Sequence, residues 1–296
     1  MRGWGLVIFG IFLGSTQISF AEQNLCELRP SSLNIQSVLT VAIIDTGLDT
    51  QIPFFRDHLW TNPGETGLDS QGRDKRTNGI DDDGNGYIDD VHGWNFAGQN
   101  NDLGDEVGHG THVAGLIVSG GKEVLSPSPL AINVRTRVMV LKYHDGRNIQ
   151  GRGRAFQKAL EYAARENANV IHISGGGYQS LPQEKRLFRQ LAEKGIPVVV
   201  ASGNKQADRP HAPFYPSAYG FTNLISVSAV DNGGRLLPTT NESPGGLFLH
   251  ERGADLASLL PGSRIGRMTG TSQAAALLCG RMIHLWETGC RSSVLK

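Results

Sequence analysis

Short apolar segments that alternate with amphipathic segments restrict the fold of this chain more than any other feature of its sequence. The first of them, 38–44, is β-branched and uninterrupted, as is typical of a strand that is buried on both faces of a sheet. Further strand-like runs are 135–143, 170–174, 197–202 and 224–230, and helical patterns mark 109–119, 152–167, 183–194 and 272–287. This order predicts an α/β fold with a doubly wound, mostly parallel β-sheet and helices on both of its faces.

Polar residues stand where several of these predicted strands end. Asp45 follows the first strand, Ser174 ends the third, and Asn204 comes shortly after the fourth. Because sites in open parallel sheets form outside the carboxyl ends of the strands, we expect these side chains to lie at one functional edge.

Ser272 stands at the start of an alanine-rich helix, directly after Gly270 and Thr271. Backbone amides and the helix dipole at such a position favour developing negative charge, although the hydroxyl could instead cap the first turn. A serine nucleophile needs an imidazole to take its proton and a carboxylate to orient that imidazole. The chain offers both in Asp45 and His109, in the order aspartate, histidine, serine.

Four motifs give the chain a resemblance to a known family. They are Asp45-Thr46-Gly47, Gly108-His109-Gly110-Thr111-His112, Ala201-Ser202-Gly203-Asn204 and Gly270-Thr271-Ser272-Gln273-Ala274. In these residues and their order the chain resembles the subtilisin-like serine proteases, or subtilases. The resemblance implies a secreted serine endopeptidase with a subtilisin-like fold that acts on polypeptide substrates through an acyl-enzyme.

The resemblance also assigns roles to individual residues. It makes Asp45, His109 and Ser272 the catalytic triad, and Asn204 a donor to the oxyanion. A weaker match at 173–176 implies that Ser174, Gly175 and Gly176 bind the substrate backbone and line the first specificity pocket. Phe214 falls near the floor of that pocket, so we expect it to be shallow, with Lys205 at its rim and small or acidic P1 residues preferred.

Other interpretations of the same residues stay open at this point. His109 and His112, three residues apart on a helix, could bind a metal ion instead. Asp45-Thr46-Gly47 also matches the motif of aspartic proteases, which need a second such aspartate. A catalytically silent subtilase fold that serves as a secreted binding module is the alternative outside the enzymes.

Two departures from the family pattern concern activity and its control. The serine motif usually continues with Pro-His, whereas this chain has Ala276-Leu277. Residues 22–37 are too few for the folded inhibitory prodomain that secreted subtilases commonly carry. A separate inhibitor or folding helper is therefore the additional partner that the sequence leaves open.

The N-terminal residues predict export. Residues 1–21 combine a positive start, an apolar run and small residues at the end, which is the pattern of a signal peptide and too short for a stable membrane anchor. We therefore divide the chain into a signal peptide (1–21), an N-terminal segment (22–37) and a peptidase domain (38–296), with an extracellular or periplasmic location. Lys+Arg and Asp+Glu number 28 each, which gives no electrostatic case for nucleic acid as a partner.

Three cysteines follow the predicted signal peptide. Cys279 lies inside the alanine-rich helix and is interpreted as a small buried apolar residue. Cys26 and Cys290 lie near the two ends and could pair in an oxidising compartment, but sequence alone does not give their connectivity.

An acidic, glycine-rich stretch between Asp45 and His109 predicts a structural calcium site. Asp81, Asp83, Asn85, Tyr87 and Asp89 occupy positions one, three, five, seven and nine of an EF-hand-like turn, with Gly86 at position six. The match is partial because position twelve is His92 instead of glutamate, so another carboxylate such as Asp90 would have to help bind the ion. A solvated acidic turn without metal is the alternative, since Asp-Gly and Asn-Gly pairs favour turns by themselves.

Overall fold

The computed structural model describes residues 22–30, 33, 36–126, 135–146, 152–204, 212–241 and 246–290. The predicted signal peptide, 1–21, and the predicted pocket-rim residue Lys205 lie outside the described residues. Among the described residues, no helix is long and apolar enough to cross a membrane.

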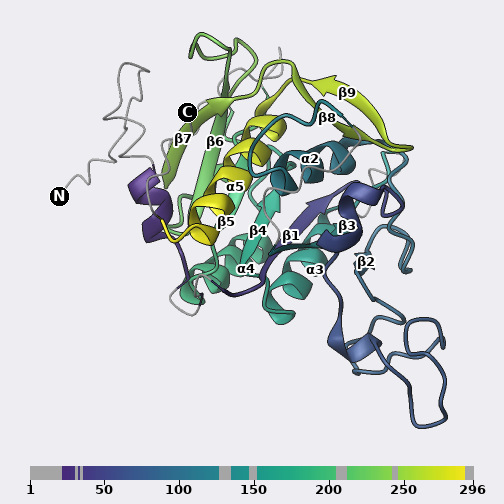
Figure 1. Cartoon of the computed structure of the whole chain (residues 1–296). Coiled ribbons are helices and arrows are strands. Elements are labelled where there is room, and N and C mark those ends of the chain that lie inside the picture. The colour runs from purple at the N-terminus through teal and green to yellow at the C-terminus, as the bar shows by residue number, and fades with distance from the viewer. Residues whose placement is uncertain are drawn as a thin grey trace.

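Seven parallel strands form the central sheet, in the order β2-β3-β1-β4-β5-β6-β7 (Figure 1). Their bounds are β1 Leu39–Asp45, β2 Gly93–Asn95, β3 Thr136–Lys142, β4 Val170–Ile173, β5 Val198–Ala201, β6 Leu224–Val230 and β7 Leu247–Arg252. The predicted α/β fold with a mostly parallel sheet is confirmed. The carboxyl ends of β1, β4 and β5 lie at one edge, because these neighbours are parallel and in register.

Helices cover both faces of this sheet. The helices are α2 His109–Val118, α3 Arg152–Arg165, α4 Pro182–Glu193 and α5 Thr271–Glu287. In β1, Val41 and Ile43 pack into the core with α2 and α5, whereas Ala42 and Ile44 pack into the core with α3 and α4. Both faces of the strand are therefore covered by helices, which is why apolar and polar residues do not alternate along its sequence.

Helices α2 and α5 lie side by side against the same face and are buried almost all round (Figure 1). A Cβ atom on Gly280 of α5 would lie 2.7 Å from the carbonyl oxygen of Leu116 in α2. Ala274, Ala275 and Ala276 are fully buried in the same helix. Small residues therefore allow α5 to pack closely enough to bring its N-terminus to the sheet edge.

Several elements are absent from the sequence prediction. They are β2, β7, the antiparallel hairpin of β8 Leu256–Leu260 and β9 Arg264–Met268, and the 3₁₀ turns η1 Pro53–His58, η2 Pro63–Glu65 and η3 Ser217–Tyr219. Strands β7 and β9 consist mostly of half-buried or exposed residues of mixed polarity. Such strands lack the continuous apolar run by which the central strands are recognised.

The two ends of the described chain are covalently joined. Cys26 and Cys290 form a disulfide, so the pairing that the sequence left open is present. Close by, the indole Nε1 of Trp286 in α5 donates a hydrogen bond to the carbonyl oxygen of Leu25 at 2.8 Å. Cys279 is a free and buried thiol, as its position in the helix predicts.

Candidate active site

A short hydrogen bond joins Asp45 to His109 at the sheet edge. Asp45 is the last residue of β1 and is 3% exposed, and His109 is the first residue of α2. The distance from His109 Nδ1 to Asp45 Oδ1 is 2.7 Å, and the same oxygen accepts the Thr46 backbone amide at 2.8 Å. This geometry fixes the imidazole ring and leaves its Nε2 directed away from the carboxylate.

A second aspartate positions the start of α2. The carboxylate of Asp105 accepts the amides of Gly108 and Thr111, both at 2.8 Å, and thereby caps the helix N-terminus. Its Oδ1 also accepts the Thr46 hydroxyl at 2.8 Å. Asp105 therefore connects the residue after Asp45 to the helix that carries His109. The sequence analysis missed it, because Asp105 lies three residues before the N-cap position, Gly108, where no capping signal marks it.

Ser272 lies in the first turn of α5 and is bonded twice to Ser174. Its hydroxyl donates to the Ser174 carbonyl oxygen at 3.1 Å, and the Ser174 hydroxyl donates to the Ser272 carbonyl oxygen at 3.3 Å. Among the described residues, the hydrogen bond of the Ser272 hydroxyl therefore runs to the residue that follows β4 and not to the His109 imidazole. The predicted serine is at the same sheet edge as the Asp45–His109 pair.

Asn204 lies beside the start of α5. Its side-chain Oδ1 accepts the Thr271 amide at 3.2 Å and the Thr271 hydroxyl at 3.3 Å. With the oxygen held in this way, the amide nitrogen is the atom left to donate. The residue itself is exposed to solvent.

The two members of the short hydrogen bond shift each other's pKa. Burial alone would raise the pKa of Asp45, but the charge and hydrogen bond of His109, with the Thr46 amide, hold it below its usual value. Burial alone would lower the pKa of His109, but the Asp45 charge and hydrogen bond outweigh burial and raise it above 6.5. The imidazole of His109 therefore keeps its proton to a higher pH than a free histidine does.

His112 does not share a binding site with His109. It is fully buried, its Nε2 lies 3.0 Å from the Leu256 carbonyl oxygen of β8, and burial lowers its pKa to about 4. His109 instead bonds to Asp45 on β1. In the part of the chain that the structure describes, neither histidine belongs to a group that could hold a metal ion.

His172 on β4 is a buried histidine that the sequence analysis did not single out. Its Nε2 lies 2.8 Å from the Ser174 hydroxyl oxygen, while its Nδ1 is buried without a hydrogen-bond partner among the described residues. Burial lowers its pKa to about 4. Since the single proton of the Ser174 hydroxyl goes to Ser272, the neutral imidazole donates from Nε2. His172 thereby continues the row of hydrogen bonds from Ser272 through Ser174 into the core.

The Phe214 ring lies between Gly176 and Gly203. A Cβ on Gly176 would lie 2.7 Å from its ring, and one on Gly203 would lie 2.5 Å from it. The ring also packs edge-on against Tyr178, with 5.4 Å between centroids. Both positions therefore need glycine to leave room for this large ring.

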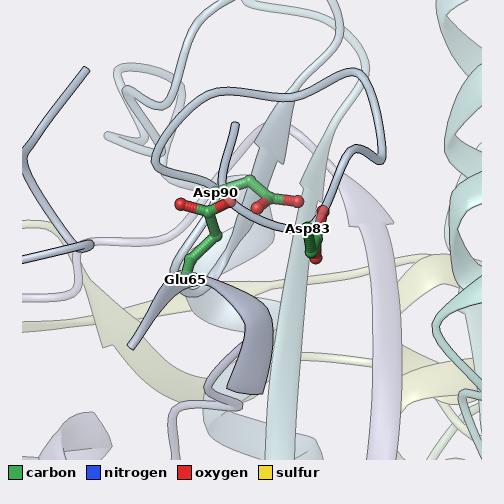
Figure 2. Close-up of side chains that lie close together, drawn as sticks. All are labelled: Glu65, Asp83 and Asp90. Carbon is green, nitrogen blue, oxygen red and sulfur yellow. The ribbon is translucent and has the colours of Figure 1, made fainter. Parts of the chain in front are cut away.

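The side chains predicted to bind calcium do not converge on a single position. The Asp81 carboxylate accepts the Asn85 and Gly86 amides at 3.0 and 2.7 Å, and that of Asp89 accepts the Gly79 amide at 3.1 Å. Asn85 Oδ1 accepts the Tyr87 amide at 2.8 Å. Asp83 alone of the predicted set joins a cluster of carboxylates, whose other members are Glu65 and Asp90 (Figure 2). The calcium prediction itself stays a prediction.

Comparison with known proteins decides the family. The model of the subtilase family matches residues 36–289, which is most of the chain and includes all four motifs. The chain belongs to the subtilase family. Membership classifies it as a serine-type endopeptidase, a hydrolase, and confirms the resemblance drawn from its motifs.

Curated relatives of this subtilase include proteases from bacteria and from malaria parasites. It is 27% identical over 250 residues to the major intracellular serine protease of Bacillus subtilis, covering 82% of this chain and 67% of that protein. It is 32% identical over 181 residues to subtilisin-like protease 2 of Plasmodium falciparum, covering 60% of this chain but 13% of that protein. It is 33% identical over 185 residues to the cell wall-associated protease of Bacillus subtilis, covering 62% of this chain and 19% of that protein. The subtilase spans well under half of the latter two.

Solved structures share the fold of this subtilase. The prenylagaramide maturation protease PagA superposes with a TM-score of 0.57 at 17% identity, over 88% of this chain and 77% of that one. The S218A mutant of the PatA protease domain superposes with a TM-score of 0.56 at 20% identity, over 88% of this chain and 84% of that one. These similarities support a subtilisin-like fold.

The departure after Ser272 leaves helix α5 of this subtilase intact. Ala276 is fully buried and Leu277 is 4% exposed, and the helix runs through both without a break. Ala276 is the sixth residue of α5, where alanine keeps the backbone N–H that a proline would remove from the helix. The replacement of proline by alanine is therefore compatible with a regular, buried helix after Ser272.

Proposed function

We propose that this subtilase hydrolyses peptide bonds through an acyl-enzyme formed on Ser272. The 2.7 Å bond between Asp45 and His109, at the sheet edge where Ser272 begins α5, carries the proposal. Asp45 holds the imidazole so that Nε2 is free to accept a proton. The Ser272 hydroxyl turns from the Ser174 carbonyl toward His109, gives up its proton and attacks the substrate carbonyl carbon. His109 then protonates the leaving amine, and water releases the acyl group by the reverse steps.

Hydrogen-bond donors beside Ser272 stabilise the charge that develops on the substrate carbonyl oxygen. The Asn204 amide and the Ser272 backbone N–H serve this role in the proposal, because Oδ1 of Asn204 is already occupied by Thr271. Ser174, Gly175 and Gly176 continue from β4, and their backbone groups bind the extended substrate.

A fluorophosphonate probe tests this mechanism, because it forms a covalent bond only with an activated serine. We expect labelling of the full chain to be lost in Ser272→Ala and nearly lost in His109→Ala. The double variant should lose little more activity than either single variant, since the triad acts as a unit. His112→Ala is the control; if it abolishes turnover while His109→Ala does not, the assignment is wrong.

The same assay separates the alternatives. A catalytically silent binding module would not react with the probe at all. An aspartic-type protease using Asp45 would be inhibited by pepstatin and insensitive to the fluorophosphonate.

Export to an extracellular or periplasmic compartment belongs to the same proposal. The disulfide between Cys26 and Cys290 supports it, because such bonds persist in oxidising compartments. Expression of the whole chain with residues 1–21 should give an exported product that begins near Glu22, and N-terminal sequencing checks this. Co-purification from its native secretome would reveal whether a separate inhibitor or folding helper accompanies it.

A further inference from the structure

His172 places a polar ring in the apolar layer between the sheet and α5. It is fully buried, and its paired neighbours in β1 and β5 are Ile43 and Val199, which both belong to the core with α5. Burying an imidazole costs more free energy than burying an aliphatic side chain, unless hydrogen bonds offset the loss of hydration. The hydrogen bonding of His172 is therefore the guide to its role.

The hydrogen bond of this ring points toward the site. Nε2 lies 2.8 Å from the Ser174 hydroxyl oxygen, whereas Nδ1 has no partner in the described part of the chain. The proton lies on Nε2, because a proton on Nδ1 would leave a buried N–H without an acceptor. Burial lowers the pKa of His172 to about 4, so the ring is neutral and carries this single proton at neutral pH.

This donor fixes the direction of the Ser174 hydroxyl. A hydroxyl has one proton and two lone pairs, and the Nε2–H of His172 occupies one of the lone pairs. The Ser174 proton then points to the Ser272 carbonyl oxygen, with 3.3 Å between the two oxygens. The result is a directed pair of hydrogen bonds, from His172 to Ser174 and from Ser174 to the backbone of Ser272.

Ser174 contacts Ser272 at two atoms, and the two contacts behave differently in the proposed reaction. The bond from the Ser272 hydroxyl to the Ser174 carbonyl, at 3.1 Å, breaks when that hydroxyl turns toward His109. The bond from the Ser174 hydroxyl to the Ser272 carbonyl does not have to break, so it holds the backbone while the side chain rotates. Backbone position matters here, because a displacement of about 1 Å can lower a reaction rate by about a hundredfold.

We infer that His172 is a positioning residue for the reaction at Ser272 and acts through the Ser174 hydroxyl. The inference rests on the proposed function, in which Ser272 is the nucleophile. Because His172 is fully buried, it does not touch the substrate. It orients the hydroxyl that holds the first turn of α5, so its effect belongs in kcat and not in KM.

A double-mutant cycle on the full chain tests this link, with kcat and KM measured on a peptide that the parent cleaves. His172→Ala and Ser174→Ala each break the directed pair, and we expect each to lower kcat by about tenfold while KM stays within about twofold. The double variant should have a kcat within about twofold of either single variant, because both changes remove the same interaction. Losses that multiply to about a hundredfold would overturn the inference.

A matched control separates positioning from a general loss of stability. His58 is also a buried histidine, but its Nδ1 lies 3.0 Å from the carbonyl oxygen of Thr136, which begins β3 at the opposite edge of the sheet. His58→Ala should lower the melting temperature, as His172→Ala does, yet keep kcat within about twofold of the parent. An equal fall of kcat in both variants would show that lost stability alone is responsible.

Failure of this inference is distinguishable from failure of the proposed function. Ser174→Ala changes a half-buried side chain, so it keeps the test available if His172→Ala does not fold. An unchanged kcat in Ser174→Ala contradicts the inference, even where the fluorophosphonate probe labels the parent and not Ser272→Ala. If Ser272→Ala retains activity, the proposed function fails and the inference fails with it.

Discussion

The imidazole of His109 experiences two opposing effects, and the resulting pKa sets the working pH range. Burial favours the neutral ring, whereas Asp45 favours the charged ring and prevails, raising the pKa above 6.5. A general base must be neutral to accept a proton, so activity should rise with pH through this pKa. We expect the acidic limb of a kcat/KM profile to have its midpoint above 6.5.

Asp45→Asn provides the control for this assignment. It removes the charge that raises the pKa of His109, so the acidic midpoint should move to lower pH while the rate falls. A midpoint that stays in place would mean that another group controls the profile.

His172 is expected to position Ser174 and thereby the first turn of α5. His172→Ala removes the donor to the Ser174 hydroxyl, and we expect kcat to fall by about tenfold, the size of one hydrogen bond of about 1.4 kcal/mol. The acidic midpoint should not move, because burial lowers the pKa of His172 to about 4 and the ring is neutral throughout.

His172→Gln serves as the matched variant, since its amide nitrogen can reach Ser174 as a donor. We expect it to recover most of kcat. If both variants lose the same activity, the histidine contributes by packing alone.

Phe214 is expected to limit the size of the P1 residue. Phe214→Ala opens the space between Gly176 and Gly203, so kcat/KM for substrates with aromatic P1 residues should rise roughly tenfold or more relative to alanine. A peptide library cleaved by parent and variant measures this. A parent enzyme that already prefers phenylalanine or tyrosine would contradict the shallow pocket.

At the level of single residues, local motifs allowed Asp45, His109, Asn204 and Ser272 to be selected from the sequence. Each stands at a strand end or a helix start with small neighbours. His172 could not be selected, because its importance depends on Ser174 meeting Ser272, 98 residues away. Glu65 was missed for the same reason, since its partners come later in the chain.

Helix α4 contains a buried carboxyl in its first turn, and this should make stability depend on pH. Burial raises the pKa of Glu184 to about 7, against 4.5 in the unfolded chain. Its protonated form stabilises the fold below pH 4.5, and that contribution is lost as pH rises to about 7. We therefore expect Glu184→Gln to raise the free energy of unfolding by roughly 1–3 kcal/mol at pH 8 and little at pH 4.

Chemical denaturation at the two pH values, in the Ser272→Ala background, measures this difference. Glu193→Gln changes an exposed glutamate of the same helix and should leave both values unchanged. Equal effects of Glu184→Gln at both pH values would show that packing, not ionisation, is responsible.

The elements that could be predicted from the sequence were strands buried on both faces and a helix with one clearly buried face. Strands β1, β3, β4, β5 and β6 are buried on both faces, and α3 has one buried face, so their periodicities are clear. Strand β2 has three residues, and β7 and β9 are partly exposed, so their pairing partners decide their structure.

For the molecule as a whole, the disulfide between Cys26 and Cys290 restricts the unfolded chain over a sequence separation of 264 residues. Replacing both cysteines with serine should lower the free energy of unfolding by roughly 2–5 kcal/mol. Thermal melting of the Ser272→Ala protein with and without the replacements measures it.

Cys279→Ala is the control, because this thiol is not part of the bridge. It removes a small buried side chain but keeps the bridge, so a reductant should lower the melting temperature of this variant as much as that of the parent. If a reducing agent leaves the melting temperature of the parent unchanged, the bridge does not stabilise the fold.

The same bridge turns residues 26–290 into a covalent ring. Cutting one peptide bond in a ring opens it without releasing a piece. The segment around Gly72 is exposed, and a Cβ there would meet no other atom within 4 Å, so a neighbouring copy of the enzyme could reach the chain there. A copy nicked at that point keeps both halves tethered. It would migrate as one body under non-reducing conditions and separate into two fragments only after the sulfur bridge is opened.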